Sequence, residues 1–313
     1  MTALASPTRR RDASDRVRWL SGGARLPGSV DHRLPSPLMA RFAKKLIAEL
    51  SQPGPHGVLR GDLALVGLPG TVVTPRQGLG LPAVAFGHGW MQPTRRYRDL
   101  LRHLASWGFV VAAPATHQGL LPSHRLFAAD LHTALEVCAK VRLGTGDISV
   151  DPDRMGVVGH SFGAGAAVLA AANWPEIRAV VTLAVTETRP SAINAARDCG
   201  APALHLAAEE DRIAPPVAMA EPVSHGWKGP VQLRTVRKAN HLTFAEGRHW
   251  TDLLMDGRPR RQHADLVKAL TTAFLLRVLT DDRRYDTLLE TEVKGATLDY
   301  SRGRRQDRGR LPA

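Results

Sequence analysis

The chain has 313 residues, of which 43% are hydrophobic and 23% are charged. This balance excludes disordered, collagen-like and disulfide-scaffold proteins and allows a substantial core. The formal net charge of +13 would indicate a nucleic-acid-binding protein if it were gathered on one face. Instead, residues 1–33 hold seven Arg against three Asp, and residues 301–313 hold five Arg against one Asp. We therefore expect basic, solvated ends and no specific nucleic-acid partner.

Cysteine content and hydropathy favour a cytoplasmic protein without a cofactor. The two cysteines, Cys138 and Cys199, are too few for a disulfide framework and lack the spacing of metal ligands. The first 30 residues carry scattered charges without the apolar stretch of a signal peptide, and no run of 18 apolar residues occurs. We expect no transmembrane segment, no metal and no organic cofactor. The oligomeric state stays open.

Three parts of the chain differ in their hydropathy pattern. Residues 1–36 are rich in Arg, Gly, Pro and Ser without periodicity, which predicts a loose basic arm. From Leu38 to Leu50, apolar residues recur at helical spacing, which predicts an amphipathic helix docked on its own domain. We place one α/β domain at residues 37–280. Residues 281–313 lose apolar density, which predicts a C-terminal extension ending in a disordered basic tail.

Within the domain, short β-rich apolar runs alternate with helical stretches, a pattern typical of parallel βαβ units. The eight predicted strands cover residues 59–66, 71–73, 83–87, 110–113, 155–159, 180–184, 203–207 and 231–235. The predicted helices cover residues 95–107, 126–141, 162–172, 192–199 and 262–279. The fold class is therefore α/β, with a mostly parallel eight-stranded sheet and helices on both of its faces.

The strongest motif is GHSFG at residues 159–163, which matches G-x-S-x-G. It directly follows one predicted strand and directly precedes a predicted helix. A serine on such a turn exposes its hydroxyl at the carboxyl edge of the sheet, and the flanking glycines remove Cβ atoms that would clash. The N-terminus of the following helix favours negative charge at the same place. We predict Ser161 as a nucleophile, with Gly159 and Gly163 as the glycines of its turn.

A serine alone is a weak nucleophile, so it requires an orienting acid and a base later in the chain, in the order Ser, acid, His. Asp211 comes soon after a predicted strand, and we choose it as the acid. The alternatives, each of which also fits a solvated loop charge, are Glu187, Glu209 and Glu210. Among thirteen histidines, His241 combines this chain order with a position just past a strand, so we predict it as the base.

The oxyanion of acyl transfer requires two backbone N–H donors. One is supplied by the residue after the nucleophile, here Phe162. The other is expected from the glycine-containing turn after the predicted strand 83–87, where Trp90 is our choice and Met91 the alternative. A simple chain reversal is the non-catalytic interpretation of this turn. His88, within it, is interpreted as a supporting residue and not as a catalyst.

These motifs together resemble those of the α/β-hydrolases, within the serine-nucleophile branch that includes dienelactone-hydrolase-like proteins, chlorophyllases and cutinase-like polyester hydrolases. The resemblance spans residues 59–279. The matching pieces are FGHGW at 86–90, LASWGFVV at 104–111, DPDRM at 151–155, GHSFG at 159–163, DRIAP at 211–215 and His241. The resemblance implies Ser161, Asp211 and His241 as a catalytic triad, with Trp90 and Phe162 as oxyanion donors.

Three features separate this chain from parts of that group. Dienelactone hydrolases proper use cysteine, whereas this chain has Ser161. Polyester-degrading cutinases carry an aromatic residue just after the strand that follows the nucleophile helix, whereas residues 184–187 read AVTE, which does not favour a polyester substrate. Only residues 185–202 separate that strand from the next, too few for a cap domain.

The expected function is a serine hydrolase that cleaves small or bulky carboxylic esters through an acyl-enzyme intermediate. Thioester, lactone and amide bonds use the same machinery, so the sequence leaves the bond open. The alternative function is a non-catalytic binding protein on a hydrolase scaffold, whose basic ends contact nucleic acid or anionic membrane.

Overall fold

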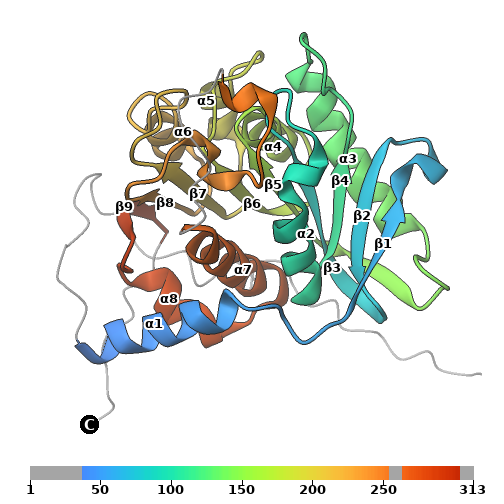
Figure 1. The fold of residues 1–313 in the computed structure, drawn as a ribbon, viewed down its shortest axis with the longest axis horizontal. Helices are drawn as coiled ribbons and strands as arrows, with labels where there is room; N and C mark the ends of the chain where they lie inside the picture. Colours follow the sequence, from blue (N-terminus) through green and yellow to red (C-terminus); the bar gives the residue numbers. More distant parts are fainter. Residues whose placement is uncertain (1–36, 254–262, 304–313) are drawn as a thin grey trace, which may run out of the picture.

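The computed structural model describes residues 37–253 and 263–303 (Figure 1). The predicted basic arm at 1–36, and residues 304–313 of the predicted tail, lie outside the described residues. The described chain forms one nine-stranded sheet in the order β1-β2-β4-β3-β5-β6-β7-β8-β9. The strands are β1 (Val58–Asp62), β2 (Gly70–Pro75), β3 (Gly78–Gly87), β4 (Val110–Pro114), β5 (Ile148–His160), β6 (Ile177–Leu183), β7 (Ala203–Ala208), β8 (Val231–Val236) and β9 (Ala296–Arg302).

The six strands from β4 to β8 in the sheet order are parallel to one another, so their carboxyl ends meet at a single edge. Antiparallel strands extend the sheet on both sides, with β1 and β2 next to β4 and with β9 next to β8. The α/β fold class with a mostly parallel sheet is thereby confirmed.

The prediction of eight strands is short by one, because β9 was not recognised. This strand comes from the predicted C-terminal extension and pairs with β8 alone, at the edge of the sheet. Of its seven residues only Ala296 and Leu298 are buried. An edge strand of this kind carries a weak apolar signal, which explains why its sequence resembled an extension outside the domain.

Helices cover both faces of the sheet (Figure 1). The α-helices are α1 (Pro37–Leu50), α2 (Arg98–Ser106), α3 (His124–Lys140), α4 (Phe162–Asn173), α5 (Ala192–Ala195), α6 (Ala220–Gly226), α7 (Ala264–Thr280) and α8 (Asp286–Glu290). One buried cluster joins α1, α2, α7 and α8 to the sheet, and the other joins α3, α4, α5 and α6. Along β3 the side chains alternate, with Val84 and Phe86 in the first cluster and Ala83 and Ala85 in the second.

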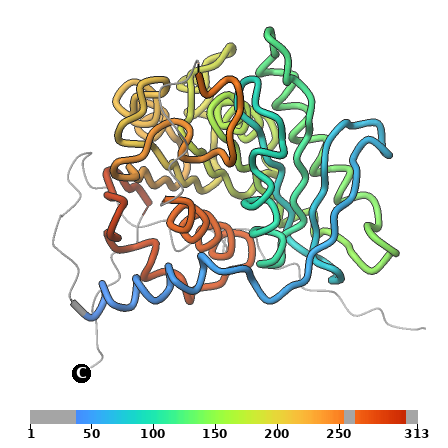
Figure 2. The backbone as a smooth tube through the Cα atoms, viewed as in Figure 1, coloured from blue at the N-terminus to red at the C-terminus, as the bar shows by residue number. Residues whose placement is uncertain are grey.

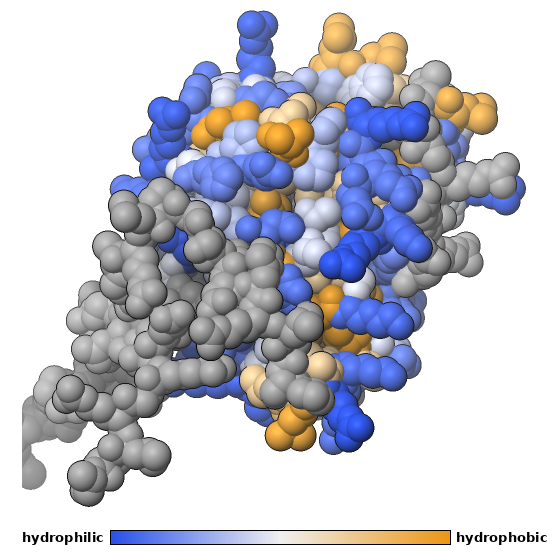
Figure 3. All heavy atoms as spheres, turned by 90° about the vertical axis from the view of Figure 1, so that its left-hand side faces the viewer, coloured by the Kyte–Doolittle hydropathy of each residue, from blue (hydrophilic) through white to orange (hydrophobic). Residues whose placement is uncertain are grey.

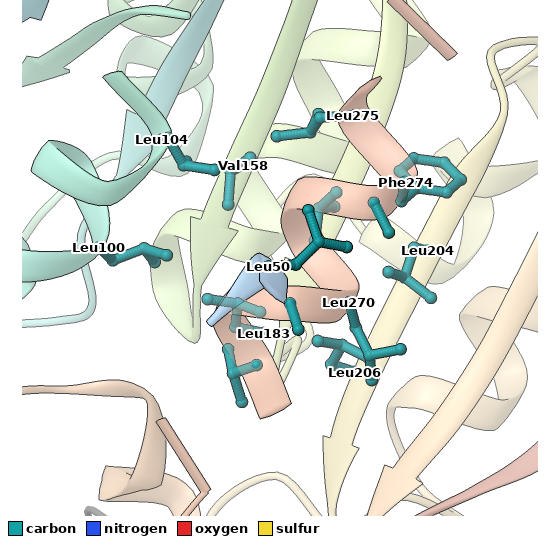
Figure 4. Close-up of a cluster of buried hydrophobic side chains, with 14 of the residues drawn as sticks. Leu50, Leu100, Leu104, Val158, Leu183, Leu204, Leu206, Leu270, Phe274 and Leu275 are labelled. Carbon is teal, nitrogen blue, oxygen red and sulfur yellow. The ribbon is translucent and has the colours of Figure 1, made fainter. Parts of the chain in front are cut away.

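The first cluster shows how the two ends of the described chain are joined. Figure 4 shows Leu270 and Phe274 of α7 among Leu204 and Leu206 of β7, with Leu50 of α1 close by. Figure 2 shows the same relation in the backbone, since the blue α1 lies along the red C-terminal helices. The amphipathic helix predicted at 38–50 therefore docks on its own domain.

The loops determine how open the carboxyl edge is. The connection from β6 to β7, residues 184–202, holds only α5 and the short 3-10 helix η4 (Ala196–Asp198), so no cap domain is inserted there.

Figure 3 shows one side of the molecule, where blue polar side chains predominate and orange apolar ones form separate patches. Within residues 37–253 and 263–303, no helix has both the length and the apolar character needed to cross a membrane.

Candidate active site

Ser161 lies on the tight turn between β5 and α4, as the sequence predicts. Its backbone has φ 54° and ψ −118°, a conformation that a non-glycine residue rarely adopts. Neighbouring backbone groups hold this turn: the Ser161 N–H donates to the Leu183 carbonyl of β6 at 2.9 Å, and its carbonyl accepts from the Ala164 and Gly165 N–H groups. The strained serine is therefore fixed between a strand end and the first turn of a helix.

The two predicted glycines allow the backbone to close around this turn. A Cβ atom at Gly163 would lie 2.2 Å from the Gly87 carbonyl carbon and oxygen at the end of β3. A Cβ atom at Gly159 would lie 2.2 Å from the Gly163 carbonyl oxygen. The turn that carries Ser161 and the end of β3 are thus in direct backbone contact, which brings the loop after β3 next to Ser161.

His241 lies just past the end of β8, at the start of the 3-10 helix η5 (His241–Phe244). Its Nε2 is 2.8 Å from Ser161 Oγ, and its Nδ1 is 2.8 Å from Asp211 Oδ2. Asn240 precedes this helix, and reciprocal hydrogen bonds between Asn240 and Thr243 fix the first turn. Three residues that are far apart in the sequence therefore form one line of hydrogen bonds.

Asp211 follows β7 and uses its two carboxylate oxygens differently. Oδ2 faces the His241 ring, while Oδ1 accepts hydrogen bonds from the Ile213 and Ala214 N–H groups at 2.9 and 2.8 Å. These two bonds fix the carboxylate orientation. Its placement supports the choice of Asp211 over the three glutamates.

Two of the alternative acids have other partners. Glu209 Oε2 accepts from the Lys238 N–H at 2.7 Å, and Glu187 Oε2 accepts from the Ile193 N–H at 3.2 Å. Glu210 comes directly before Asp211, and its own N–H donates to the Ala239 carbonyl. The contact with the His241 ring is made by Asp211.

The line of hydrogen bonds is almost fully shielded from water. Ser161 and Asp211 are each 5% exposed, and His241 is 1% exposed. A carboxylate can only accept, so Nδ1 of a neutral His241 carries the proton that Asp211 binds. Nε2 is then left with a lone pair directed at the Ser161 hydroxyl, which is the arrangement that proton removal from a serine requires.

The predicted oxyanion residues lie on the two sides of the turn that carries Ser161. Phe162 is the first residue of α4, where the helix geometry leaves backbone N–H groups without partners inside the helix. Trp90 lies in the turn after β3, which the Gln92 N–H closes onto the Gly89 carbonyl at 3.0 Å. Its indole N–H donates to the Leu120 carbonyl, which anchors this turn to the loop after β4.

The alternative donor and the supporting histidine lie in the same loop. Met91 adopts a left-handed backbone conformation, with φ 53°. His88 is fully buried, with its ring nitrogens 2.8 Å from the Gly89 carbonyl and 2.7 Å from the Thr116 carbonyl. These two contacts fix the ring in place, which supports its interpretation as a structural residue, while burial lowers the pKa of His88.

A buried arginine that no sequence motif predicts, Arg96, joins the loop after β3 to the loop after His241. The Arg96 guanidinium donates to Gln92 Oε1 at 2.5 Å and to Asp252 Oδ1 at 2.6 Å. It also donates to the Glu246 carbonyl at 2.9 Å. Because Arg96 and Asp252 are 156 residues apart, no local pattern could have identified the pair.

The comparison with protein families agrees with this geometry. A family model described as PET hydrolase-like matches residues 67–306. The chain belongs to the PET hydrolase-like family. The predicted resemblance to α/β-hydrolases is confirmed, and within the predicted group the match favours the polyester hydrolases over the dienelactone hydrolases and chlorophyllases.

The individual relatives match only part of this chain. Cutinase est1 of Thermobifida alba is 31% identical over 154 residues, which are 49% of this chain and 50% of the cutinase. Lipase 1 of Moraxella sp. (strain TA144) is 27% identical over 224 residues, which are 70% of this chain and 63% of the lipase. Cutinase est2 of Thermobifida alba is 29% identical over 51% of this chain and 52% of its own length. The chain therefore spans less than two-thirds of each relative.

The packing of the turn makes a testable prediction at Gly163. Gly163→Ala should lower the free energy of unfolding by about 3 kcal/mol or more, because the new methyl group meets backbone atoms that cannot move aside cheaply. The control is Gly200→Ala, where a Cβ atom has no neighbour within 4 Å and the expected change is within about 0.5 kcal/mol. Urea unfolding of both variants measures the difference. Equal stability of the two would contradict the close contact with β3.

Proposed function

We propose that the protein is a serine hydrolase that cleaves carboxylic esters through an acyl-enzyme intermediate. The observation that carries this proposal is the position of His241, with one ring nitrogen 2.8 Å from the Ser161 hydroxyl and the other 2.8 Å from the Asp211 carboxylate. Membership of the PET hydrolase-like family and the cutinase and lipase relatives support the same class of reaction.

In the proposed mechanism, His241 Nε2 takes the hydroxyl proton as Ser161 Oγ attacks the ester carbonyl carbon. The imidazolium that forms is stabilised by the ionised Asp211 and returns its proton to the leaving alcohol as the carbon–oxygen bond breaks. Water then enters, loses a proton to His241 and attacks the acyl-enzyme, which releases the acid and restores Ser161.

The negative charge on the former carbonyl oxygen requires donors that are already in place. We assign this role to the N–H groups of Phe162 and Trp90. The Phe162 N–H is supported by its position in the first turn of α4, where the helix dipole also favours negative charge. The Trp90 N–H is supported by the backbone contact between Gly87 and Gly163, which holds its loop beside the nucleophile.

The proposed substrates are apolar esters, both small and bulky. Large apolar side chains are exposed on the loops that follow the parallel strands, close to the edge at which Ser161 lies. They are Trp90 after β3, Leu120 and Leu121 after β4, Ile213 and Val217 after β7, and Trp250 and Leu253 after β8. The connection from β6 to β7 carries no inserted cap domain, which favours access by a large acyl or alcohol group. At the start of that connection, Val185 is buried and its side chain is small.

Removal of the nucleophile is the direct test of this function. Ser161→Ala should lower the turnover of p-nitrophenyl esters by about 10³-fold or more and should abolish covalent labelling by a fluorophosphonate probe. The unfolding midpoint should stay close to that of the parent protein, since one oxygen atom is removed. Ser51→Ala, on the turn after α1, serves as a control and should keep full turnover. Near-normal turnover by a folded Ser161→Ala protein would refute the proposal.

The choice of acid has its own test. Asp211→Asn should lower kcat by about 10⁴-fold, because an amide neither stabilises the imidazolium nor holds the required tautomer. Glu209→Gln and Glu187→Gln should leave kcat within about twofold, since each contacts a backbone N–H away from the His241 ring. Steady-state kinetics on one soluble ester compares the three variants. A larger loss at either glutamate than at Asp211 would transfer the role of the acid to that residue.

A further inference from the structure

A second line of hydrogen bonds lies behind the first and involves Tyr97 and His160. Both side chains are fully or almost fully buried. The Gly89 N–H donates to Tyr97 Oη at 3.0 Å, and Tyr97 Oη lies 2.8 Å from His160 Nδ1. His160 Nε2 in turn lies 3.0 Å from the carbonyl oxygen of His241. The line therefore begins next to Trp90 and ends on the backbone of the proposed base.

The chemistry of the partners determines the direction of every bond in this line. The carbonyl of His241 can only accept, so His160 Nε2 must carry a proton and donate it. Burial lowers the pKa of His160 well below its ordinary value, and the nearby His241 lowers it further, so the ring is neutral and Nδ1 has a lone pair. Burial also raises the pKa of Tyr97, which keeps the phenol protonated, so that its hydroxyl donates to Nδ1. Every donor in the line has an acceptor.

We propose that Tyr97 and His160 are positioning residues for ester hydrolysis, because together they hold the Trp90 loop and the backbone of His241 at a fixed separation. This inference rests on the proposed function of Ser161 and His241. The oxyanion donor and the base must act on the same substrate carbonyl in one step, so a change in their separation raises the barrier. Neither side chain touches the substrate in this role.

Two further observations support a positioning role. The Tyr97 ring packs on Phe86 of β3 with ring centroids 4.7 Å apart, and the His160 ring packs on Phe244 at 5.8 Å. These contacts fix the rings independently of the hydrogen bonds. The neighbouring Arg96 binds Gln92 in the loop after β3 and Asp252 in the loop after His241. Two adjacent residues, Arg96 and Tyr97, therefore each contribute one connection between these loops.

The first experiment removes one oxygen atom. Tyr97→Phe keeps the packing on Phe86 and leaves the Gly89 N–H and His160 Nδ1 without their partner. We expect kcat to fall about tenfold on a p-nitrophenyl ester, the effect of one lost buried hydrogen bond on the barrier, with KM within about twofold. The matched control is Tyr285→Phe. Tyr285 is also buried, and its hydroxyl donates a hydrogen bond to Glu49 of α1. This variant should keep kcat unchanged.

The second experiment tests the other residue by conservative rescue. The side chain of His160→Gln has an amide N–H that can donate to the His241 carbonyl, whereas the side chain of His160→Leu has no donor. His160→Gln should therefore retain several times more of kcat than His160→Leu, with similar KM. This comparison decides the question even if Tyr97→Phe does not give folded protein.

The outcomes separate this inference from the proposed function. Parent-like kcat in folded Tyr97→Phe, or equal kcat in the glutamine and leucine variants, would overturn the positioning role while Ser161→Ala remains inactive. A fall in kcat of the same size in Tyr285→Phe would show that loss of any buried hydroxyl slows the enzyme, which also overturns the role. Full turnover by Ser161→Ala would instead remove the proposed function on which the inference rests.

Discussion

The site depends on one backbone contact, that between the turn that carries Ser161 and the end of β3. Gly163 and Gly87 approach so closely that neither position has room for a Cβ atom. This contact holds Ser161 in a strained conformation at the edge of the sheet, and it also brings the loop with Trp90 beside it. A single steric constraint thus places the proposed nucleophile beside the loop that carries the proposed oxyanion donor Trp90.

The parallel sheet supplies the remaining parts of the site. The carboxyl ends of β5, β7 and β8 meet at one edge of the sheet, and they are followed by Ser161, Asp211 and His241, respectively. The sheet topology therefore brings three positions that are distant in the sequence close together. Hydrogen bonds then fix each loop: the Ile213 and Ala214 N–H groups orient Asp211, and His160 holds the backbone of His241. Burial of this arrangement strengthens its hydrogen bonds, because little water competes for them.

Local sequence patterns were sufficient to predict those parts of the fold and of the site that depend on local geometry. The turn at 159–163 is one such part, since a strand, two glycines and a helix of small residues identify it directly. Asp211 and His241 were predicted because each follows an apolar run that forms a strand, although three glutamates remained as alternatives until the geometry was known. The strand β9 was missed because an edge strand with few buried residues carries little apolar signal.

The connections between loops could not be predicted in this way. Tyr97 and His160 are 63 residues apart, and their contact depends on the path of the chain after β3. His160 occupies the first variable position of the G-x-S-x-G motif. The sequence therefore does not distinguish a histidine that contacts the His241 backbone from one that only fills space. Such pairs become visible only when the loop conformations are known.

The central claim is that Ser161 carries the acyl group during ester hydrolysis, and trapping that intermediate tests it most directly. The protein is mixed with excess p-nitrophenyl ester, quenched with acid within the first turnover, digested and analysed by mass spectrometry. The account predicts a burst of p-nitrophenolate close to one equivalent per enzyme and an acyl group on the peptide that contains Ser161, absent from the Ser161→Ala protein. Turnover with the acyl group on a different residue would contradict it.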